Sequence, residues 1–337
     1  MVQSGVAMPR APGHDPGQAG PPIGFTWEEY VDWLVSTCGT LAAVAERLAS
    51  RRGFSDDVGS VERALRRLRA RGQLAGGTWG TRALAAFGLP AAADARARWM
   101  GAYHSRFTDL PVPMCVDLLN LWDRPPVSEA PGSRMWLALA HAKCALRSGN
   151  VEEASQHFSR GAASSAAAPP DALAERLLGV AFIASRNEPE RVTSLLDEVE
   201  PLLEREMDAS DRACLHARWV DQRAYEINKG RGAPGAPSAE ELYLSIPTSG
   251  APPFALCRRA NGLAYALWKR GEREGGAELA REACRHAGDG GHLRLRAMAL
   301  QMLARIVGGE EGAECRHRAL AIVTSLDDEA LRLRFTR

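Results

Sequence analysis

Arginine side chains that could contact DNA are concentrated in one short stretch of the chain. Residues 60–82 contain six arginines and a single acid, Glu62. On a helix, Ser60, Arg63 and Arg67 would share one outward face, where guanidinium groups can donate paired hydrogen bonds to guanine. Neighbouring arginines would contact phosphates, which attract any guanidinium regardless of base sequence. The candidate DNA-binding residues are Ser60, Arg63, Arg66, Arg67, Arg71 and Arg82.

A second group of residues, nearer the C-terminus, suits the binding of a peptide. Cationic, amide and aromatic side chains share one face of a predicted helix before Gly271. An amide side chain can pair with a peptide backbone as donor and acceptor, and Arg or Lys can hold carboxylates. The candidates on this helix are Arg258, Asn261, Tyr265, Trp268 and Lys269, and the corresponding set before Gly149 is Trp136, Leu139, Lys143 and Arg147. The alternative is that the two tryptophans only pack between helices.

Metal binding and catalysis have no support in the spacing of reactive residues. Three Cys-x-His pairs occur, at Cys214, Cys284 and Cys315, but residues two apart on a helix point in nearly opposite directions and cannot chelate one ion. Phosphate-binding glycine loops, nucleophile elbows and HExxH sequences are absent. We therefore expect no metal, no cofactor and no enzymatic activity.

The arginine-rich stretch needs a small helical module to position it. Thr26 and Glu29 have the spacing of a capping box, which starts a first helix. Gly39 and Thr40 suit the end of that helix and the start of a second. A third helix is predicted from about Ser60 to Arg71. The glycines within residues 73–82 then predict a short hairpin.

Three short helices followed by a glycine-rich hairpin resemble the winged helix-turn-helix family. The resemblance implies that the third helix enters the major groove and that the hairpin, as the wing, places Arg82 on the DNA backbone. Two other interpretations stay open: a winged helix that docks on protein, and a plain helical cap on the rest of the chain.

The remainder of the chain predicts helix after helix, with breaks at regular intervals. Residues 91–105 and 112–122 predict connecting helices. Alanine-rich helices then break at Gly149, near Arg186, at Gly271 and at Gly308, and the last two breaks lie 37 residues apart. Only the unit at Gly149 contains Ala-x3-Phe, as Ala154 and Phe158.

This layout resembles the tetratricopeptide repeat family, in which small residues let paired helices pack closely. The resemblance implies that the first helix of each pair lines a concave groove. Proline and glycine interrupt the array over residues 230–253, where Ser238 and Glu241 form a second capping box. We interpret this stretch as a surface loop with a short helix.

Composition limits the function further. The net charge of +1 gives no global attraction to nucleic acid or membrane, and no stretch has the length and hydrophobicity of a membrane span. Seven cysteines without a Cys-x-x-Cys pair are typical of a reducing compartment, so we expect a cytoplasmic protein. Residues 1–24 lack a signal-peptide core and predict a disordered leader.

Together these patterns predict an all-α protein with three parts: a leader over residues 1–24, a winged-helix-like domain over 25–90 and a tetratricopeptide-like array over 91–337. The leading hypothesis is a bacterial-type regulator whose head binds double-stranded DNA and whose array binds a peptide, a protein or a second copy of the chain. The alternative is an adaptor that binds proteins only.

Overall fold

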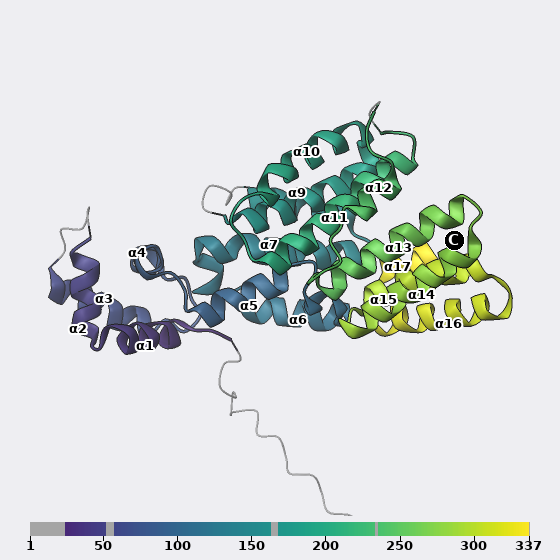
Figure 1. Cartoon of the computed structure of the whole chain (residues 1–337). Coiled ribbons are helices and arrows are strands. Elements are labelled where there is room, and N and C mark those ends of the chain that lie inside the picture. Colours follow the sequence, from purple (N-terminus) through teal and green to yellow (C-terminus); the bar gives the residue numbers. More distant parts are fainter. Residues whose placement is uncertain (1–23, 52–56, 163–167, 233–234, 337) are drawn as a thin grey trace, which may run out of the picture.

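The prediction of an all-α fold is confirmed. The computed structural model describes residues 24–51, 57–162, 168–232 and 235–336, and all regular elements within these ranges are helices (Figure 1). The predicted leader lies outside the described residues, apart from Gly24.

The N-terminal module begins with three helices that pack around one small core. They are α1 (Trp27–Cys38), α2 (Leu41–Ala49) and α3 (Val58–Arg69). The predicted capping box is present, because the Thr26 side chain accepts from the Glu29 backbone and Glu29 accepts from the Thr26 backbone. The core is apolar and contains Trp27, Tyr30, Leu34, Val44, Leu48, Leu65 and Leu68, all fully or almost fully buried.

The predicted hairpin over residues 73–82 is wrong, because helix α4 (Gly77–Phe87) occupies most of that stretch. Its glycines serve close packing. A Cβ atom at Gly76 would lie 2.3 Å from the Trp27 indole ring, and one at Gly80 would lie 2.8 Å from it. The indole N–H of Trp27 also donates to the carbonyl of Leu74 at 2.9 Å. The glycine-rich run therefore makes room for the Trp27 ring. Arg82 lies on α4 and not on a hairpin.

A short connection leads from this module into the array. It comprises α5 (Ala91–Gly101), the 3₁₀ turn η1 (Arg106–Asp109), α6 (Val112–Trp122) and the turn η2 (Val127–Glu129). The predicted helix over 112–122 matches α6, whereas the helix predicted over 91–105 ends at Gly101. Residues 102–110, which include η1, connect α5 to α6, and we name them the inner segment.

The array consists of helix pairs joined at the predicted breaks. The turns fall at Gly149, after Asn187, at Gly271 and at Gly308, and the insertion contains a helix capped by Ser238 and Glu241. The pairs are α7 (Pro131–Arg147) with α8 (Val151–Ala162), α9 (Pro170–Asn187) with α10 (Val192–Leu203), α11 (Ala209–Asn228) with α12 (Ala239–Leu244), α13 (Pro253–Lys269) with α14 (Arg273–Asp289), and α15 (Leu293–Val307) with α16 (Gly309–Ser325). The turn η4 (Pro189–Arg191) joins α9 to α10, and α17 (Glu329–Phe335) ends the described chain.

Small residues let neighbouring helices of successive pairs approach closely. A Cβ at Gly262 of α13 would lie 2.2 Å from the Tyr243 ring on α12, and one at Gly179 of α9 would lie 2.2 Å from the Phe158 ring on α8. Ala142 and Ala264 are fully buried. Larger side chains at these crossings would force the helices apart.

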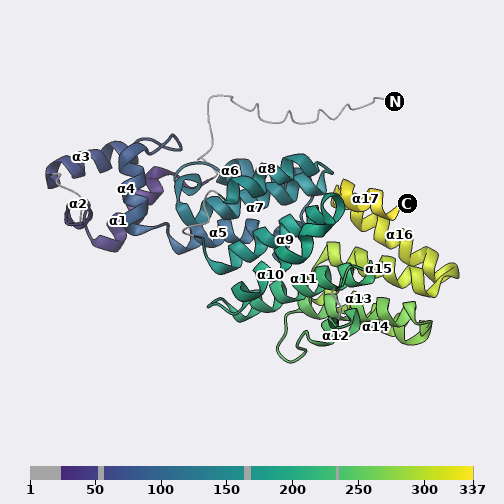
Figure 2. The same ribbon diagram turned by 90° about the horizontal axis from the view of Figure 1, so that it is seen from above.

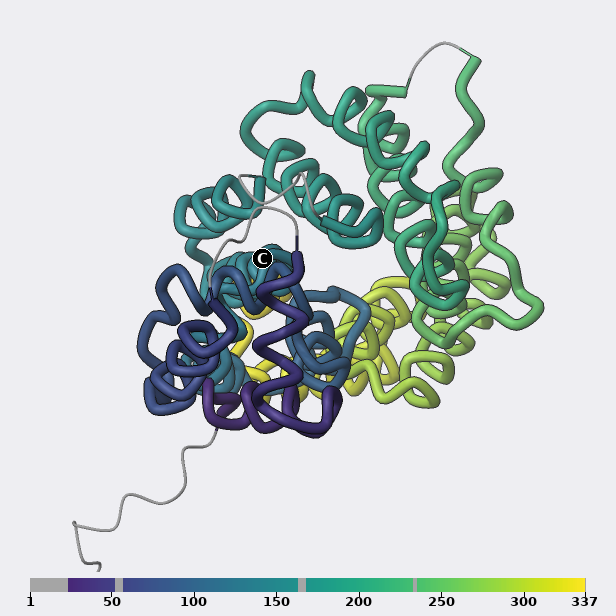
Figure 3. Tube along the Cα trace, turned by 90° about the vertical axis from the view of Figure 1, so that its left-hand side faces the viewer, coloured from purple at the N-terminus to yellow at the C-terminus, as the bar shows by residue number. Residues whose placement is uncertain are grey.

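The array curves until its last helices return to its first pair (Figures 2 and 3). The guanidinium of Arg147, on α7, lies 3.1 Å from the Asp328 carboxylate at the start of α17. The backbone N–H of Val112 donates to the carbonyl of Leu326 at 3.0 Å. The inner helices α7, α9, α11, α13 and α15 thereby surround the inner segment.

Candidate peptide-binding groove

The inner segment lies against all five inner helices, and Tyr103 is its central contact. Cationic groups from four helices surround the Tyr103 ring, at centroid distances of 5.8 Å for Lys143, 4.2 Å for Arg218, 5.6 Å for Arg258 and 5.7 Å for Arg294. Arg294 also donates to the phenol oxygen at 3.2 Å. Such contacts between cations and an aromatic face are strongest where water is excluded.

The backbone of the segment is held as a bound peptide would be. Lys143 donates to the Gly101 carbonyl, just before the segment, and Arg147 donates to the Leu110 carbonyl at 2.7 Å. The Tyr103 backbone N–H donates to the Glu175 carboxylate at 2.9 Å. Side chains of the array therefore satisfy polar backbone groups near both ends of this stretch, which has no sheet partner of its own.

Glu175, on α9, organises the charges around Tyr103. It is almost fully buried and lies 3.2 Å from the Lys143 ammonium and 2.5 Å from the Arg218 guanidinium. Burial alone would raise the pKa of Glu175, but these two cations and His104 hold it well below its usual range. The carboxylate is therefore a fixed negative charge between two helices and the inner segment.

His104 extends the same network toward the first turn of α11. Its Nε2 lies 2.6 Å from the Asp211 carboxylate, and Arg98 pairs with both Asp211 and Asp171. Burial would lower the pKa of His104, but hydrogen bonds to Asp211 and Glu175 raise it above its usual value.

Asp328 fixes the other end of the segment. Its carboxylate accepts from Arg147 at 3.1 Å and from Arg294 at 2.7 Å, and it also caps α17 through the Leu331 N–H at 3.0 Å. Asp109 of the segment accepts from the Arg294 backbone N–H at 2.9 Å. One buried carboxylate thus connects the first inner helix, the last inner helix and α17.

The cations give the Tyr103 phenol an unusual acidity. Burial alone would raise the pKa of Tyr103, but Arg294, Arg258 and Arg218 outweigh it and lower the pKa from 10.0 to about 8. Burial lowers the pKa of Lys143 to about 8, although Glu175 opposes this effect.

The peptide-binding residues predicted from sequence separate into three groups. Arg258, Lys143 and Arg147 contact the inner segment. Trp136 and Leu139 on α7 are packing residues, because the Trp136 backbone and ring lie against Gly101 and Leu139 is fully buried in the core. The remaining candidates lie farther along α13, where the Tyr265 and Trp268 rings are 5.8 Å apart, Asn261 is partly buried and Lys269 is exposed.

The candidate DNA-binding residues have varied surroundings. Arg63 and Arg67 are exposed on α3, and Arg63 donates to the Ser60 hydroxyl at 2.9 Å. Arg66 pairs with Glu62, and Arg71 donates to the carbonyl of Ala75. The Arg82 guanidinium lies 5.0 Å from the Trp79 ring within α4.

Sequence reasoning missed most of the inner network. Tyr103, Glu175, Arg218, Arg294 and Asp328 were not among its candidates, although they make the principal contacts. One signal was available, since Glu175 and Arg176 interrupt a mainly apolar stretch of α9 and a buried charge there needs a partner. The partners of Glu175 are 32 to 72 positions away in sequence and depend on the curvature of the array.

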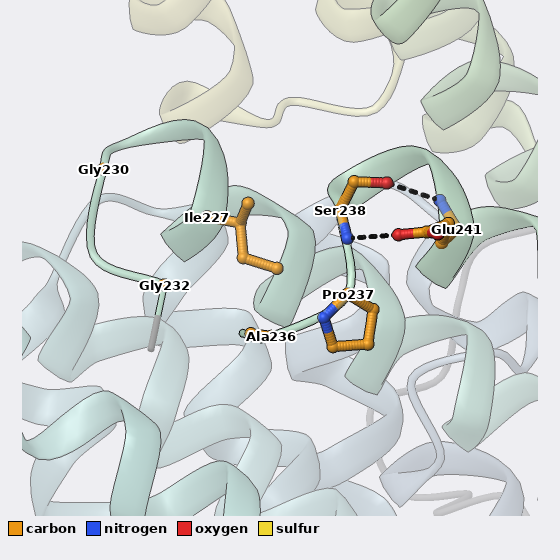
Figure 4. A pocket seen from close by; sticks show the side chains of 7 residues that line it. All are labelled: Ile227, Gly230, Gly232, Ala236, Pro237, Ser238 and Glu241. Carbon is orange, nitrogen blue, oxygen red and sulfur yellow. Dashed lines mark hydrogen bonds between the residues drawn. The ribbon is translucent and has the colours of Figure 1, made fainter. Parts of the chain in front are cut away.

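A surface hollow of about 410 Å³ beside the insertion offers less chemistry than the groove (Figure 4). Its polar side chains, Ser238 and Glu241, are already bonded to each other's backbone in the capping box, and the rest of its lining is apolar or glycine. We therefore assign the candidate site to the groove.

Comparison with known proteins gave no match: no protein family, no curated protein and no solved structure is significantly similar to the chain. None of the described helices combines the length and hydrophobicity needed to cross a membrane. Within the described residues, no group of three or more His, Cys, Asp or Glu side chains could hold a metal ion.

Proposed function

We propose that this protein binds peptide segments of a partner along the inner helices of its array. The array acts as a receptor surface, and its charged residues position ligand backbone and side chains. On this proposal the inner segment is a built-in ligand that fills one half of the groove.

The observation that supports the proposal is the way the groove holds residues 102–110. The inner helices supply a carboxylate that accepts from the Tyr103 N–H, and guanidinium and ammonium groups that donate to the adjoining carbonyls. Cationic side chains also surround the Tyr103 ring. Contacts of this kind let a protein recognise a bound peptide: backbone pairing provides affinity, and a pocket holds one anchor side chain.

The test supplies the segment from outside. Tyr103→Ala removes the anchor, and a synthetic peptide with the sequence of residues 102–110 is then titrated into the full-length variant by calorimetry. We expect saturable binding and a rise in the melting temperature, because a ligand of the folded state stabilises it. The same peptide with alanine in place of its tyrosine serves as the control. Equal heats from the two peptides, or no binding to a folded variant, would overturn the proposal.

A second candidate function, DNA binding by the N-terminal module, is supported by α3. This helix packs Val61, Leu65 and Leu68 into the core and exposes Arg63 and Arg67 on its opposite side. An exposed arginine pair on an anchored helix suits the major groove. The absence of the predicted hairpin removes the wing from this proposal, so α3 alone would carry the contact.

A further inference from the structure

The inner face of the array continues beyond Tyr103 into a second half with its own chemistry. Glu175, Arg218, Arg258 and Arg294 are among the residues that contact the inner segment from α9, α11, α13 and α15. On a helix, positions seven and eleven residues later return to the same face, about 10 and 16 Å farther along the axis. We name these positions the open half; they are Phe182, Tyr225, Tyr265 and Gln301, followed by Arg186, Lys229, Lys269 and Arg305.

The composition of the open half is strongly biased. Three of its first four positions are aromatic, all of its last four are cationic, and none is acidic. Phe182 and Tyr225 are 38% and 46% exposed, although they stand on the inner side of the array. The cations lie over aromatic rings: Arg186 is 4.9 Å from the Phe182 centroid, Lys229 is 5.6 Å from that of Tyr225, and Arg305 is 5.9 Å from that of Trp268.

A cation near the C-terminus of a helix is stabilised by the helix dipole, which could account for one such residue per helix. It does not account for Arg334. This residue comes from α17, and both Arg186 of α9 and Arg305 of α15 act electrostatically on it, so that three helices contribute positive charge to one region.

Arg334 is exposed on α17, and the protein around it is the largest cause of its lowered pKa. Arg186 and Arg305 lower the pKa of Arg334 further. Like charges held in one region disfavour each other, and an anion placed among them would relieve that cost.

Two amide side chains stand between the two halves along their helices: Gln222 on α11 and Asn261 on α13. Asn261 Oδ1 and Gln222 Oε1 are buried atoms that accept no hydrogen bond from the described residues. Buried acceptors of this kind are usually satisfied by a donor. A peptide backbone supplies N–H donors at regular intervals, whereas a phosphodiester backbone supplies none.

We propose that the open half binds an acidic segment of a partner protein, with carboxylates among Arg186, Arg305 and Arg334 and apolar or aromatic side chains against Phe182 and Tyr225. This inference rests on the proposed peptide-binding function and specifies the chemistry of its ligand. Charge complementarity argues for a partner in trans, because residues 1–23 contain one acid, Asp15, and one arginine, Arg10, and cannot supply the required charge. The neighbouring half of the array already holds polypeptide through its backbone groups, which favours a peptide over a nucleic acid.

The test uses fluorescence anisotropy with the full-length protein and three labelled probes. The first is a short peptide of alternating glutamate and tyrosine, the second has glutamine in place of every glutamate, and the third is oligothymidylate. We expect the acidic peptide to bind at least roughly tenfold more tightly than its glutamine counterpart, and its affinity to fall as salt is added. Tighter binding of oligothymidylate than of the acidic peptide would overturn the proposal in favour of a nucleic acid.

Substitutions locate the binding on the protein. Arg334→Gln and Arg186→Gln should each weaken binding of the acidic peptide roughly tenfold, because each removes a charged hydrogen-bond donor. Arg318→Gln, an exposed arginine on the outer helix α16, is the matched control and should change nothing. Melting temperatures of all three variants show that they fold.

Equal affinity in Arg334→Gln, Arg186→Gln and the control would overturn the inference, as would the absence of binding to the unmodified protein. These failures remain distinguishable from a failure of the proposed function. If the residue 102–110 peptide still binds the Tyr103→Ala variant, the groove binds peptides and only the acidic preference is wrong.

Discussion

At the scale of single residues, the groove depends on a few buried charges that are balanced within the chain. Glu175 is opposed by Lys143 and Arg218, and Asp328 by Arg147 and Arg294. A buried ion is costly unless partners replace its lost hydration, so each member depends on the others. The inner segment shares in this balance, because its own groups fill positions that would otherwise be unsatisfied.

The Tyr103 phenol should be the first tyrosine to ionise. Its folded-state pKa of about 8 lies below its ordinary value of 10.0, whereas burial raises the pKa values of Tyr30 and Tyr243. Tyrosinate absorbance followed during a pH titration should therefore show a phase near pH 8 that is missing in Tyr103→Phe. The absence of that phase from the wild-type curve would contradict the cationic surroundings described above.

The lowered pKa of Tyr103 also makes the stability of the fold depend on pH. Because the folded-state pKa of Tyr103 is depressed, its ionisation stabilises the fold fully above pH 10 and this contribution is lost as the pH falls through 8. The difference in unfolding free energy between wild type and Tyr103→Phe should therefore grow in favour of wild type from pH 8 to 10. Denaturant titrations at the two pH values measure it.

Asp328 and its neighbour Asp327 allow the same substitution to be compared at a buried and an exposed position. Asp328→Asn removes a buried charge that two guanidinium groups share, and we expect a loss of about 3–5 kcal/mol in unfolding free energy. Asp327 is exposed and has a positive φ of 51°, which asparagine tolerates, so Asp327→Asn should change stability by less than about 0.5 kcal/mol. Equal losses in both variants would show that Asp328 does not connect the ends of the array.

At the scale of elements, the sequence predicts helix positions well where caps and breaks are local. Both capping boxes, helix α6 and the turns at Gly149, Gly271 and Gly308 follow from nearby residues and are present. The error at α4 has a non-local cause, because the glycines there accommodate Trp27, about 50 positions earlier. Tyr103 was missed for a similar reason: its importance comes from helices that the curvature of the array brings together.

Close packing between elements predicts opposite outcomes for two glycines in helices. A Cβ at Gly101 of α5 would lie 2.5 Å from the Trp136 carbonyl oxygen, a backbone atom, so Gly101→Ala should destabilise by about 1–3 kcal/mol. Gly288 of α14 has nothing within 4 Å of such a Cβ, so Gly288→Ala should stabilise by up to about 1 kcal/mol. Thermal unfolding distinguishes the two, and similar shifts in the same direction would mean that α5 and α7 pack differently.

Helix α3 carries the DNA prediction. Arg63→Ala and Arg67→Ala should each weaken duplex binding by the full-length protein by about 1–3 kcal/mol. Arg69→Ala is the control, because Arg69 lies 2.9 Å from Asp32 and is engaged within the module. The measurement is fluorescence anisotropy against mixed-sequence duplexes at two salt concentrations. If Arg63→Ala and Arg67→Ala bind as the control does, α3 does not contact DNA and the adaptor interpretation takes its place.

At the scale of the whole molecule, a curved stack of helix pairs surrounds a stretch of its own chain (Figures 2 and 3), and Phe182 and Tyr225 of the open half remain partly exposed. The filled half shows what the groove can hold, and the open half repeats the same helical positions with aromatic and cationic side chains. The account therefore makes one central claim: ligand peptides lie along the inner helices.

Photo-crosslinking tests this claim most directly. The peptide of residues 102–110, with p-benzoylphenylalanine in place of its tyrosine, is irradiated with the full-length Tyr103→Ala variant, and the adducts are mapped by mass spectrometry. The account predicts adducts on the inner helices α11, α13 and α15, close to Arg218, Arg258 and Arg294, whose guanidinium groups surround the native Tyr103 ring. Adducts confined to the outer helices α10, α14 and α16 would contradict it.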